Sequence, residues 1–416
     1  MDRNTKLFSK DFTLVVIGQI ISLFGNAIIR FALPLYLLNQ TGSSALYGTV
    51  SACALISAVI LSPIGGILAD RVNKRNIMVA LDFFTAAVIL TFSLLLGKIS
   101  LILLIAATMM LLYGIAGAYQ PTVQASVPAL VPEERFMEAN SVINTIGSLA
   151  SLLGPVLGGI LYSIYGLSPV VGVCIACFLM SAIMEIFIKI PFVRQESGGS
   201  MWKSIRNDFF GSIRFIRKEK PVIGKGVLAV CGINLFLSAM ITVGLPYMVT
   251  EVLNFDSAAA NRLYGFAEGA LAAGGLAGGI GAGIFAKRLT IQKAGNLIIA
   301  CAGCVFPMGI ALMLSISDMV SYIVMAVCCF GIMVCSTIFT VQVMAFVQAQ
   351  TPQTLIGKVI ALMITVAMCA QPVGNVLYGL LFEVCYGAEA AVVLLAGGIS
   401  LVIAVGTKSI FKLCKE

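Results

Sequence analysis

Long apolar spans recur along the whole chain, and they constrain its fold more than any other feature. Each span has about 20 residues or more, the length that a helix needs to cross a bilayer. Of the 416 residues, 60% are hydrophobic and only 11% are charged. A soluble domain carries about 25% charged residues. The sequence therefore predicts an all-α membrane protein whose surface mostly faces lipid.

Twelve spans are predicted, six on each side of one long polar segment. They are expected at residues 12–38, 45–69, 77–97, 100–123, 139–165, 168–190, 222–249, 262–286, 292–315, 318–346, 355–383 and 387–411. In the polar segment, Phe209, Phe210, Phe215 and Ile216 alternate with basic residues, as in an amphipathic helix on a membrane surface. We expect an N-terminal six-helix bundle at 1–190, a cytoplasmic linker at 191–221 and a C-terminal six-helix bundle at 222–416.

The positive charges predict the orientation of the chain. Nearly all of the 26 Lys and Arg residues fall on the side of the predicted topology that holds both termini. Cytoplasmic loops carry such an excess, so both termini are expected in the cytoplasm. The net charge of +8 is then loop charge and does not indicate a nucleic-acid partner. The first residues carry mixed charges and no cleavage-site pattern, so a removable signal peptide is not expected.

The two halves of the sequence resemble each other at a nearly constant offset. Leu46–Gly48 recurs as Leu263–Gly265, Ala69–Arg71 aligns with Ala286–Arg288, Thr122–Gln124 recurs as Thr340–Gln342, and Pro155 aligns with Pro372. An even number of spans in each half predicts parallel repeats related by an axis along the membrane normal. Two such bundles suit transport by alternating access around a site at the midplane.

A short charged loop, residues 65–75 with the sequence GGILADRVNKR, joins the second and third predicted spans. Asp70 can accept charge-assisted hydrogen bonds, and arginine guanidinium groups can donate two at once. We expect a gate on the cytoplasmic side formed by Asp70, Arg71, Lys74 and Arg75, with Asp82 joining it from the third span. The alternative is that these cations only orient the loop.

This loop resembles the signature of the major facilitator superfamily between its second and third helices, and the resemblance extends over essentially the full chain. It implies a twelve-helix secondary transporter. The family often has glycine at the position of Asn73. Asparagine tolerates the left-handed conformation that glycine adopts, so we expect this departure to be neutral.

Residues 150–159, ASLLGPVLGG, resemble the motif associated with exporters of this superfamily, with Ala150 in place of the first glycine. Gly154, Gly158 and Gly159 permit close backbone approach, and Pro155 permits bending. The alternative is ordinary packing of small residues. The segments Pro132–Arg135 and Ala139–Ser141 also resemble the macrolide-efflux and siderophore-exporter branch.

Polar residues inside the spans are the candidates for substrate and proton binding, because such residues are rare in membranes and usually functional. Gln19, Asn26 and Arg30 share one helical face, which we expect to line the central cavity. Glu268 is the candidate proton-coupling acid or ligand for a cationic substrate, with Arg30 as its partner. The alternative is a fixed ion pair.

Uncharged polar residues are expected to complete the cavity, and the two acids near the cytoplasmic ends, Glu138 and Glu185, are expected to be interfacial. The uncharged residues are Asn144, Asn234, Gln371 and Asn375. Adaptable apolar walls with few polar anchors suit a bulky amphipathic substrate.

These features predict a secondary active transporter of the cell membrane, acting as a monomer in proton-coupled efflux of small amphipathic molecules of the drug or macrolide type. A proton-coupled uptake symporter for a metabolite and a lipid flippase remain alternatives. An enzyme is disfavoured, because the chain has no histidine and no adjacent carboxylate pair is expected at the midplane. A passive channel is disfavoured by the two-fold repeat. No cofactor and no metal are expected.

The gate hypothesis predicts that Asp70→Asn abolishes transport while expression is unchanged, because the amide cannot accept the charge-assisted hydrogen bonds of the loop cations. Transport by membranes with matched amounts of protein measures this. Full activity of the variant would exclude Asp70 from a gate.

Overall fold

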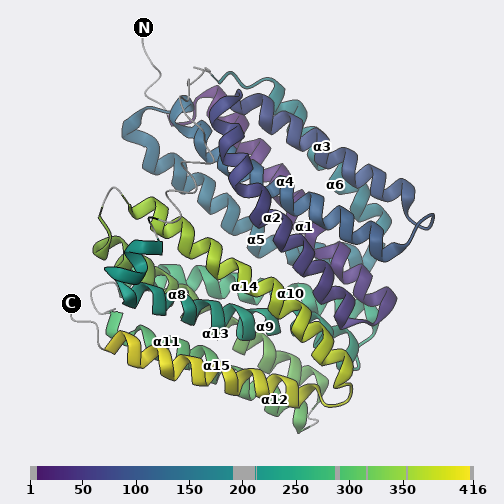
Figure 1. Ribbon diagram of the computed structural model, residues 1–416. Coiled ribbons are helices and arrows are strands. Elements are labelled where there is room, and N and C mark those ends of the chain that lie inside the picture. The colour runs from purple at the N-terminus through teal and green to yellow at the C-terminus, as the bar shows by residue number, and fades with distance from the viewer. Residues whose placement is uncertain are drawn as a thin grey trace. The chain divides into compact units, whose positions relative to one another are not determined.

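The protein is almost entirely helical in the residues that its computed structural model describes (Figure 1), which are 7–190, 211, 213–285, 291–314, 317–352 and 355–412, with the backbone alone for 63–71 and 410–412. The helices are α1 (Lys10–Thr41), α2 (Ser44–Arg71), α3 (Lys74–Leu95), α4 (Leu101–Leu130), α5 (Phe136–Tyr165), α6 (Leu167–Ile186), α8 (Pro221–Ile233), α9 (Ala239–Tyr247), α10 (Ser257–Ile284), α11 (Ile291–Gly303), α12 (Val305–Met313), α13 (Asp318–Gln350), α14 (Ile356–Val384) and α15 (Glu389–Lys412). A short 3-10 helix, η1 (Glu133–Arg135), precedes α5, and two π-helical turns, η2 (Asn234–Ser238) and η3 (Met248–Val252), follow α8 and α9.

Eleven helices within the described residues are long and apolar enough to cross a membrane. Three of these spans combine consecutive helical segments: Glu133–Tyr165, Pro221–Val252 and Ile291–Met313. The predicted eighth span is present as the 28-residue helix α10, but its many glycines and Glu268 reduce its hydropathy, and it is not one of the eleven. The predicted all-α membrane fold is confirmed, whereas the exact number of twelve spans is not.

Local capping sets the ends of several helices. The Ser9 side chain accepts a hydrogen bond from the backbone N–H of Phe12 (3.2 Å) at the start of α1, which ends at Gly42 in the left-handed conformation (φ 62°). Asn73 begins α3 by accepting a hydrogen bond from the N–H of Arg75 (3.0 Å). Its φ is −58°, so Asn73 does not adopt the left-handed conformation that asparagine tolerates. Asparagine is suited to this position as a helix cap.

The chain divides into two compact units. Unit 1 comprises Met1–Gly42, Val50–Glu196 and Asp256–Gly269, and unit 2 comprises Ser43–Thr49, Ser197–Phe255 and Ala270–Glu416. The first residues of α2 therefore belong to unit 2, and the first half of α10 belongs to unit 1. The bundle boundaries expected from the sequence stay a prediction.

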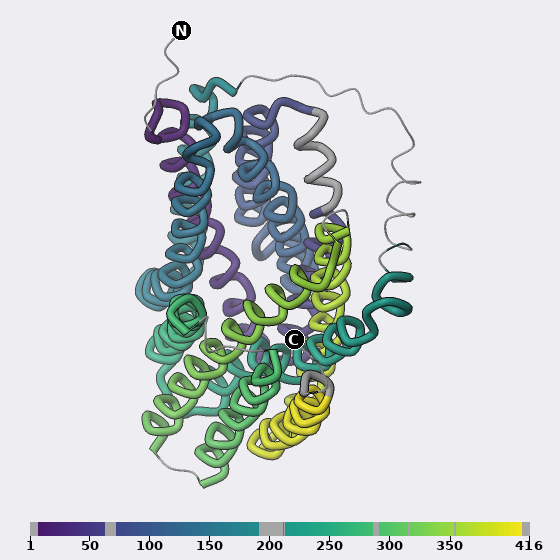
Figure 2. Tube along the Cα trace, turned by 90° about the vertical axis from the view of Figure 1, so that its left-hand side faces the viewer, coloured from purple at the N-terminus to yellow at the C-terminus, as the bar shows by residue number. Residues whose placement is uncertain are grey.

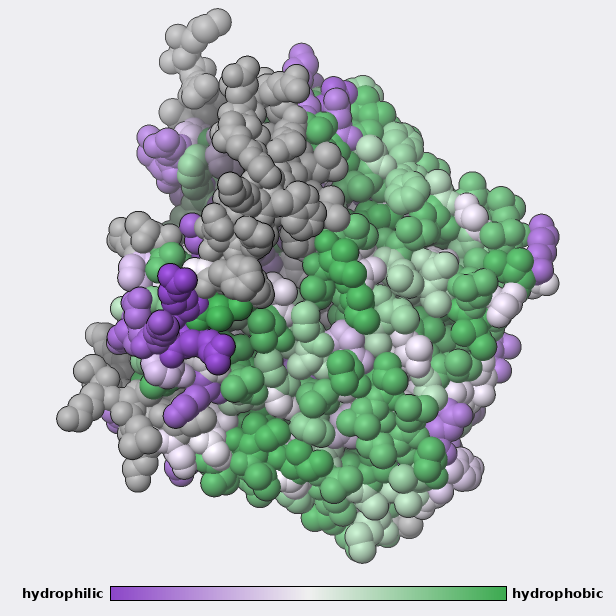
Figure 3. All heavy atoms as spheres, in the orientation of Figure 1, coloured by the Kyte–Doolittle hydropathy of each residue, from purple (hydrophilic) through white to green (hydrophobic). Residues whose placement is uncertain are grey.

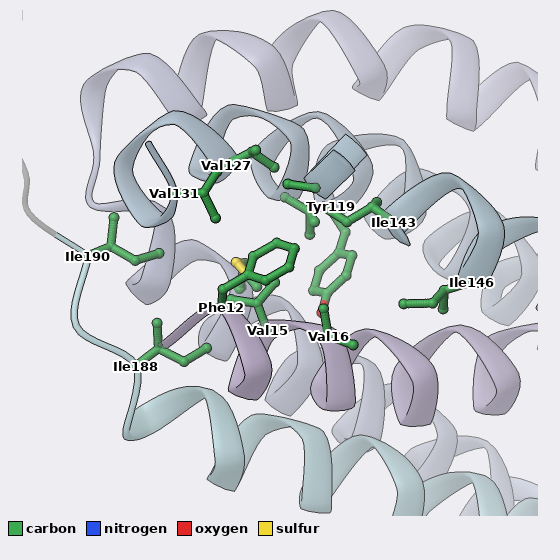
Figure 4. Packing of buried hydrophobic residues seen from close by; sticks show 13 residues of the cluster. Phe12, Val15, Val16, Tyr119, Val127, Val131, Ile143, Ile146, Ile188 and Ile190 are labelled. Carbon is green, nitrogen blue, oxygen red and sulfur yellow. The ribbon is translucent and has the colours of Figure 1, made fainter. Parts of the chain in front are cut away.

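In unit 1, α1 packs along α5 and α6, and α3 packs along α4 and α6 (Figures 1 and 2). An apolar cluster fills one end of this unit and includes Phe12, Tyr119 and Ile188 (Figure 4). Figure 4 shows the Tyr119 ring beside the Phe12 ring and near aliphatic side chains, with its hydroxyl end beside Val16 of α1. The Tyr119 hydroxyl donates a hydrogen bond to Glu185 of α6 (2.6 Å), so this apolar cluster borders a buried polar group.

Unit 2 contains a second apolar cluster, built mainly from α8, α11, α13 and α14. Phe215 and Ile216 belong to this cluster and are buried, while the adjacent Arg217 and Lys218 are exposed. The segment is thus amphipathic in its described part, but its apolar side packs on protein instead of on the expected membrane surface. Phe209 and Phe210 lie outside the described residues.

Large apolar side chains are exposed along the helices, as expected for contact with lipid. Leu103 is 65% exposed, Leu228 70% and Val402 74%. On the face shown in Figure 3, apolar side chains cover most of the helical surface, and hydrophilic side chains gather toward its margins. A soluble monomer rarely exposes apolar surface of this extent.

Close packing of α11 on α15 gives the first structural prediction. A Cβ at Gly295 would lie 2.4 Å from the Cα of Lys408, whereas a Cβ at Gly303 of the same helix would have nothing within 4 Å. We expect Gly295→Ala to reduce the free energy of unfolding by about 1–3 kcal/mol through overpacking. The melting temperature of the purified protein measures this.

Gly303→Ala is the matched control for the change at Gly295, and it should not reduce the melting temperature. Equal melting temperatures for the two variants would contradict the described packing of α11 on α15.

Candidate functional site

The polar face of α1 combines a buried end with a more accessible end. Gln19 is fully buried, and neither atom of its amide group has a hydrogen-bond partner among the described residues. Asn26 and Arg30, farther along the helix, are half-buried. Gln19 thus departs from the expectation that the whole face lines a cavity, because it lies in the interior of unit 1.

Arg30 is held by an aromatic ring. Its guanidinium carbon lies 3.4 Å from the centre of the Tyr113 ring of α4, a cation–π contact. The one ion pair within the described residues joins Arg135 and Glu138 (2.9 Å). The expected pairing of Arg30 with Glu268 is therefore wrong. The sequence placed the two residues at similar depth, but it could not predict that Tyr113 occupies the face of the guanidinium.

Glu268 has a neutral neighbour on its own helix. Its Oε1 accepts a hydrogen bond from the hydroxyl of Tyr264, one turn earlier on α10 (3.2 Å). The Tyr264 ring stacks on Phe31 of α1, with ring centres 4.8 Å apart. These contacts place the half-buried carboxylate beside the same helix that carries Arg30.

The exporter-type motif of α5 lies at close contacts with two helices of unit 1. A Cβ at Gly154 would lie 2.3 Å from the Cβ of Ala27 on α1, and one at Gly158 would lie 3.0 Å from the Phe31 ring. A Cβ at Gly159 would lie 2.8 Å from the carbonyl oxygen of Asn261 on α10.

The contact of the motif with α10 is reciprocal. A Cβ at Gly265 would lie 2.7 Å from the carbonyl oxygen of Pro155 and 3.2 Å from the Cα of Gly159. Only glycine permits this approach from both sides, so the small residues of the motif bring α5 against the segment of α10 that carries Glu268.

A polar contact among the side chains of Asn39, Asn261 and Tyr162 was not predicted from the sequence. The amide nitrogen of Asn39 donates to Asn261 Oδ1 (2.9 Å) and lies 3.3 Å from the hydroxyl of Tyr162. Each of the three residues lies near the end of its helix, where polar side chains are common. That common occurrence explains why no sequence signal singled them out.

The expected cytoplasmic gate is only partly described. The side chains of Asp70 and Arg71 lie outside the described residues, and Lys74 is half-buried. The Arg75 guanidinium donates to the carbonyl oxygen of Ile186 at the end of α6. Arginine at this position neutralises the partial negative charge of a helix C-terminus.

The two remaining acids of the cytoplasmic half occupy different positions from those expected. Asp82 is 2% exposed and accepts a hydrogen bond from Ser22 of α1 (3.0 Å), so it lies inside unit 1 instead of extending the loop. Glu185, in the last turn of α6, is 0% exposed and accepts from Tyr119, so it is buried against a neighbouring helix, whereas Glu138 is exposed. Spacing along a helix does not tell which faces of neighbouring helices meet.

Two of the predicted polar residues of unit 2 make hydrogen bonds between helices of that unit. Asn234 donates to the carbonyl oxygen of Ala367 (2.9 Å), and Gln371 donates to Thr242 (3.2 Å). Asn375 is buried, and its amide group has no partner among the described residues. Asn144, on α5 of unit 1, is exposed. Asn234 also begins the π-helical turn η2, and such turns are frequent at functional sites.

Comparison with known proteins shows that the chain is similar to membrane transporters. The family model described as Major Facilitator Superfamily matches residues 15–375. Macrolide efflux protein A of Streptococcus pyogenes is 25% identical over 376 residues, which are 89% of this chain and 88% of the relative. Multidrug resistance protein MdtG of Citrobacter koseri is 31% identical over 183 residues, 42% of this chain and 44% of the relative.

Solved transporter structures share the fold at low sequence identity. A crystal structure of nucleoside transporter NupG has a TM-score of 0.74 at 12% identity and covers 96% of this chain and 100% of its own. A bacterial homologue of iron transporter ferroportin in the inward-facing state has a TM-score of 0.72 at 17% identity and covers 96% of this chain and 99% of its own.

The cation–π contact between Arg30 and Tyr113 is expected to stabilise the folded protein. We expect Tyr113→Leu to reduce the free energy of unfolding by about 1–2 kcal/mol, because leucine offers the guanidinium no aromatic face. Tyr113→Phe retains the ring and should remain close to the wild type. Thermal unfolding of the purified variants measures the difference, and equal losses for the two would show that the ring face does not stabilise Arg30.

Proposed function

Because the chain belongs to the major facilitator superfamily, we propose that it exports small amphipathic molecules of the drug or macrolide type in exchange for protons, by alternating access. The proposal is supported by the macrolide efflux and multidrug resistance proteins among its relatives. The export direction is also supported by the motif on α5.

The position of Glu268 is the observation that carries the proposal. The carboxylate lies on the segment of α10 that packs against the exporter-type motif, with Gly265 against Gly159 and Gly269 against Val156. A Cβ at Gly269 would lie 2.6 Å from a methyl group of Val156. A change in the charge of Glu268 therefore acts on an interface that has almost no room for adjustment.

The mechanism follows from the neutral surroundings of this carboxylate. Tyr264 can donate one hydrogen bond to Glu268 but cannot neutralise its charge. Protonation removes the cost of holding a charge away from water, and it changes the relative stability of two packings of α10 on α5. In the proposed cycle, proton binding and release at Glu268 alternate with binding of the cargo.

The half-buried polar residues of each unit are the proposed cargo-binding groups of that unit. In unit 1 these groups are Asn26 and Arg30, whose guanidinium lies over the Tyr113 ring. In unit 2 they are Asn234 and Gln371. Few polar anchors among apolar walls favour molecules that are largely apolar with a small number of polar groups.

The chain is further proposed to act as a monomer in the cell membrane, with both termini in the cytoplasm. The excess of Lys and Arg on one side of the predicted topology supports this orientation.

Reconstituted protein tests the role of Glu268. Purified wild type and Glu268→Gln are placed in proteoliposomes with an imposed pH gradient, and the movement of a panel of macrolides and lipophilic cations is followed. We expect gradient-driven movement by the wild type and loss to the level of protein-free liposomes for Glu268→Gln, because the amide cannot exchange a proton.

Glu138→Gln is the matched control for the change at Glu268, since Glu138 is exposed and pairs only with Arg135 among the described residues. This variant should transport like the wild type. Transport that ignores the pH gradient, or that survives Glu268→Gln, would contradict the assignment of the coupling acid.

A further inference from the structure

Two carboxylates are buried together inside unit 1, away from Glu268 in sequence and on different helices. Asp82 of α3 is 2% exposed, and Glu185 of α6 is 0% exposed. Asp82 Oδ1 accepts a hydrogen bond from the Ser22 hydroxyl (3.0 Å), and Glu185 Oε1 accepts one from the Tyr119 hydroxyl (2.6 Å). Four helices of the unit therefore contribute to one polar cluster.

The two carboxylates lie close enough to interact with each other. Ser181, one turn before Glu185, lies beside Asp82 and donates to the carbonyl oxygen of Gly18 on α1 (3.1 Å). A Cβ at Gly18 would lie 3.5 Å from Cγ of Glu185. The absence of a side chain at Gly18 thus leaves room for Glu185 against α1.

Several polar atoms of the cluster lack a partner. Asp82 Oδ2 and Glu185 Oε2 have no hydrogen-bond partner among the described residues. Gln19 lies next to Gly18 and one turn before Ser22 on the same helix, is 0% exposed, and has both amide atoms without a described partner. A buried polar group without a hydrogen-bond partner is costly, so the unpartnered oxygens of two neighbouring carboxylates indicate a missing ligand.

The charge of the cluster indicates the kind of ligand. The titratable groups that interact with the two carboxyl groups are each other and Tyr119. No described Lys or Arg forms an ion pair with either carboxylate, and the nearby Arg75 donates to the carbonyl oxygen of Ile186. Two uncompensated negative charges buried in the protein are very costly, and a positive charge must offset them.

We propose that Asp82 and Glu185 form a buried binding site for a small monovalent cation, H⁺ or Na⁺, with Gln19, Ser22, Tyr119 and Ser181 around it. The side-chain acceptors of the cluster are all oxygen atoms, which hard cations prefer. The unpartnered oxygens Asp82 Oδ2 and Glu185 Oε2 are the atoms that the cation contacts. This site is distinct from Glu268 and does not depend on the proposed cargo.

Cation binding to the purified full-length protein, without any transport substrate, tests the site. Binding of radioactive Na⁺ is measured at constant pH, and infrared spectra are recorded in the absence of Na⁺ for the C=O band of a protonated carboxylic acid. We expect the wild type to give one of these signals and Asp82→Asn and Glu185→Gln each to lose it. Glu138→Gln, which changes an exposed carboxylate, should retain it.

The Na⁺-binding measurement and the infrared measurement together distinguish Na⁺ from H⁺ as the bound cation. Sodium binding that both substitutions abolish identifies Na⁺, and a carboxylic acid band that both abolish in a protein that binds no Na⁺ identifies H⁺. The absence of both signals from the wild type, or a signal that survives both substitutions, would overturn the proposal.

Milder variants keep the test valid where an acid replacement prevents folding. Tyr119→Phe and Ser181→Ala each remove one hydroxyl group and leave both carboxylates in place. Each should shift the half-occupancy of the cation by about tenfold, the effect of one hydrogen bond to a charged group. Unchanged half-occupancy in both would overturn the proposed surroundings of the site. Since the readout is binding, the result is independent of whether the protein exports drugs.

Discussion

Close approach of helix backbones at glycine is the constraint on which the packing of both units depends. Lipid tails are as apolar as the helices that they surround, so helix association relies on short-range packing contacts. In unit 1 these contacts bring α5 against α1 at Gly154 and against α10 at Gly159. In unit 2, Gly274 faces the carbonyl oxygen of Phe330, and a Cβ there would lie only 2.4 Å from it. Such interfaces have a defined register and little tolerance for added atoms.

Polar groups inside this tightly packed interior are too costly to be incidental. Gln19, Asp82 and Glu185 lie in the interior of unit 1, whereas Arg30 and Glu268 are half-buried and each meets an aromatic residue. The two sets differ in exposure and in partners. The proposals follow this difference: cargo and the coupling proton are proposed at the half-buried groups, and a bound cation is proposed at the buried carboxylates.

The sequence was sufficient for the fold class, the approximate positions of eleven spans within the described residues and the superfamily, because each follows from long runs of apolar residues or from contiguous motifs. It was also sufficient to locate the motif on α5, whose small residues lie at the contacts that their spacing predicts. The partners of individual charges could not be predicted. Asp82 meets Ser22 instead of the loop, and Arg30 meets Tyr113 instead of Glu268, since helical spacing gives the depth of a side chain but not the neighbouring helix that it faces. The role of Asn73 as a helix cap could not be predicted either, because asparagine suits both a helix cap and a left-handed turn.

The direction of transport is the central claim, and inverted membrane vesicles test it most directly. In such vesicles the cytoplasmic face points outward, so an exporter moves its cargo into the lumen. With an acidic lumen, the account predicts accumulation of a labelled macrolide that stops when the pH gradient is dissipated. Accumulation found only in vesicles of the native orientation would contradict export and would favour an uptake transporter.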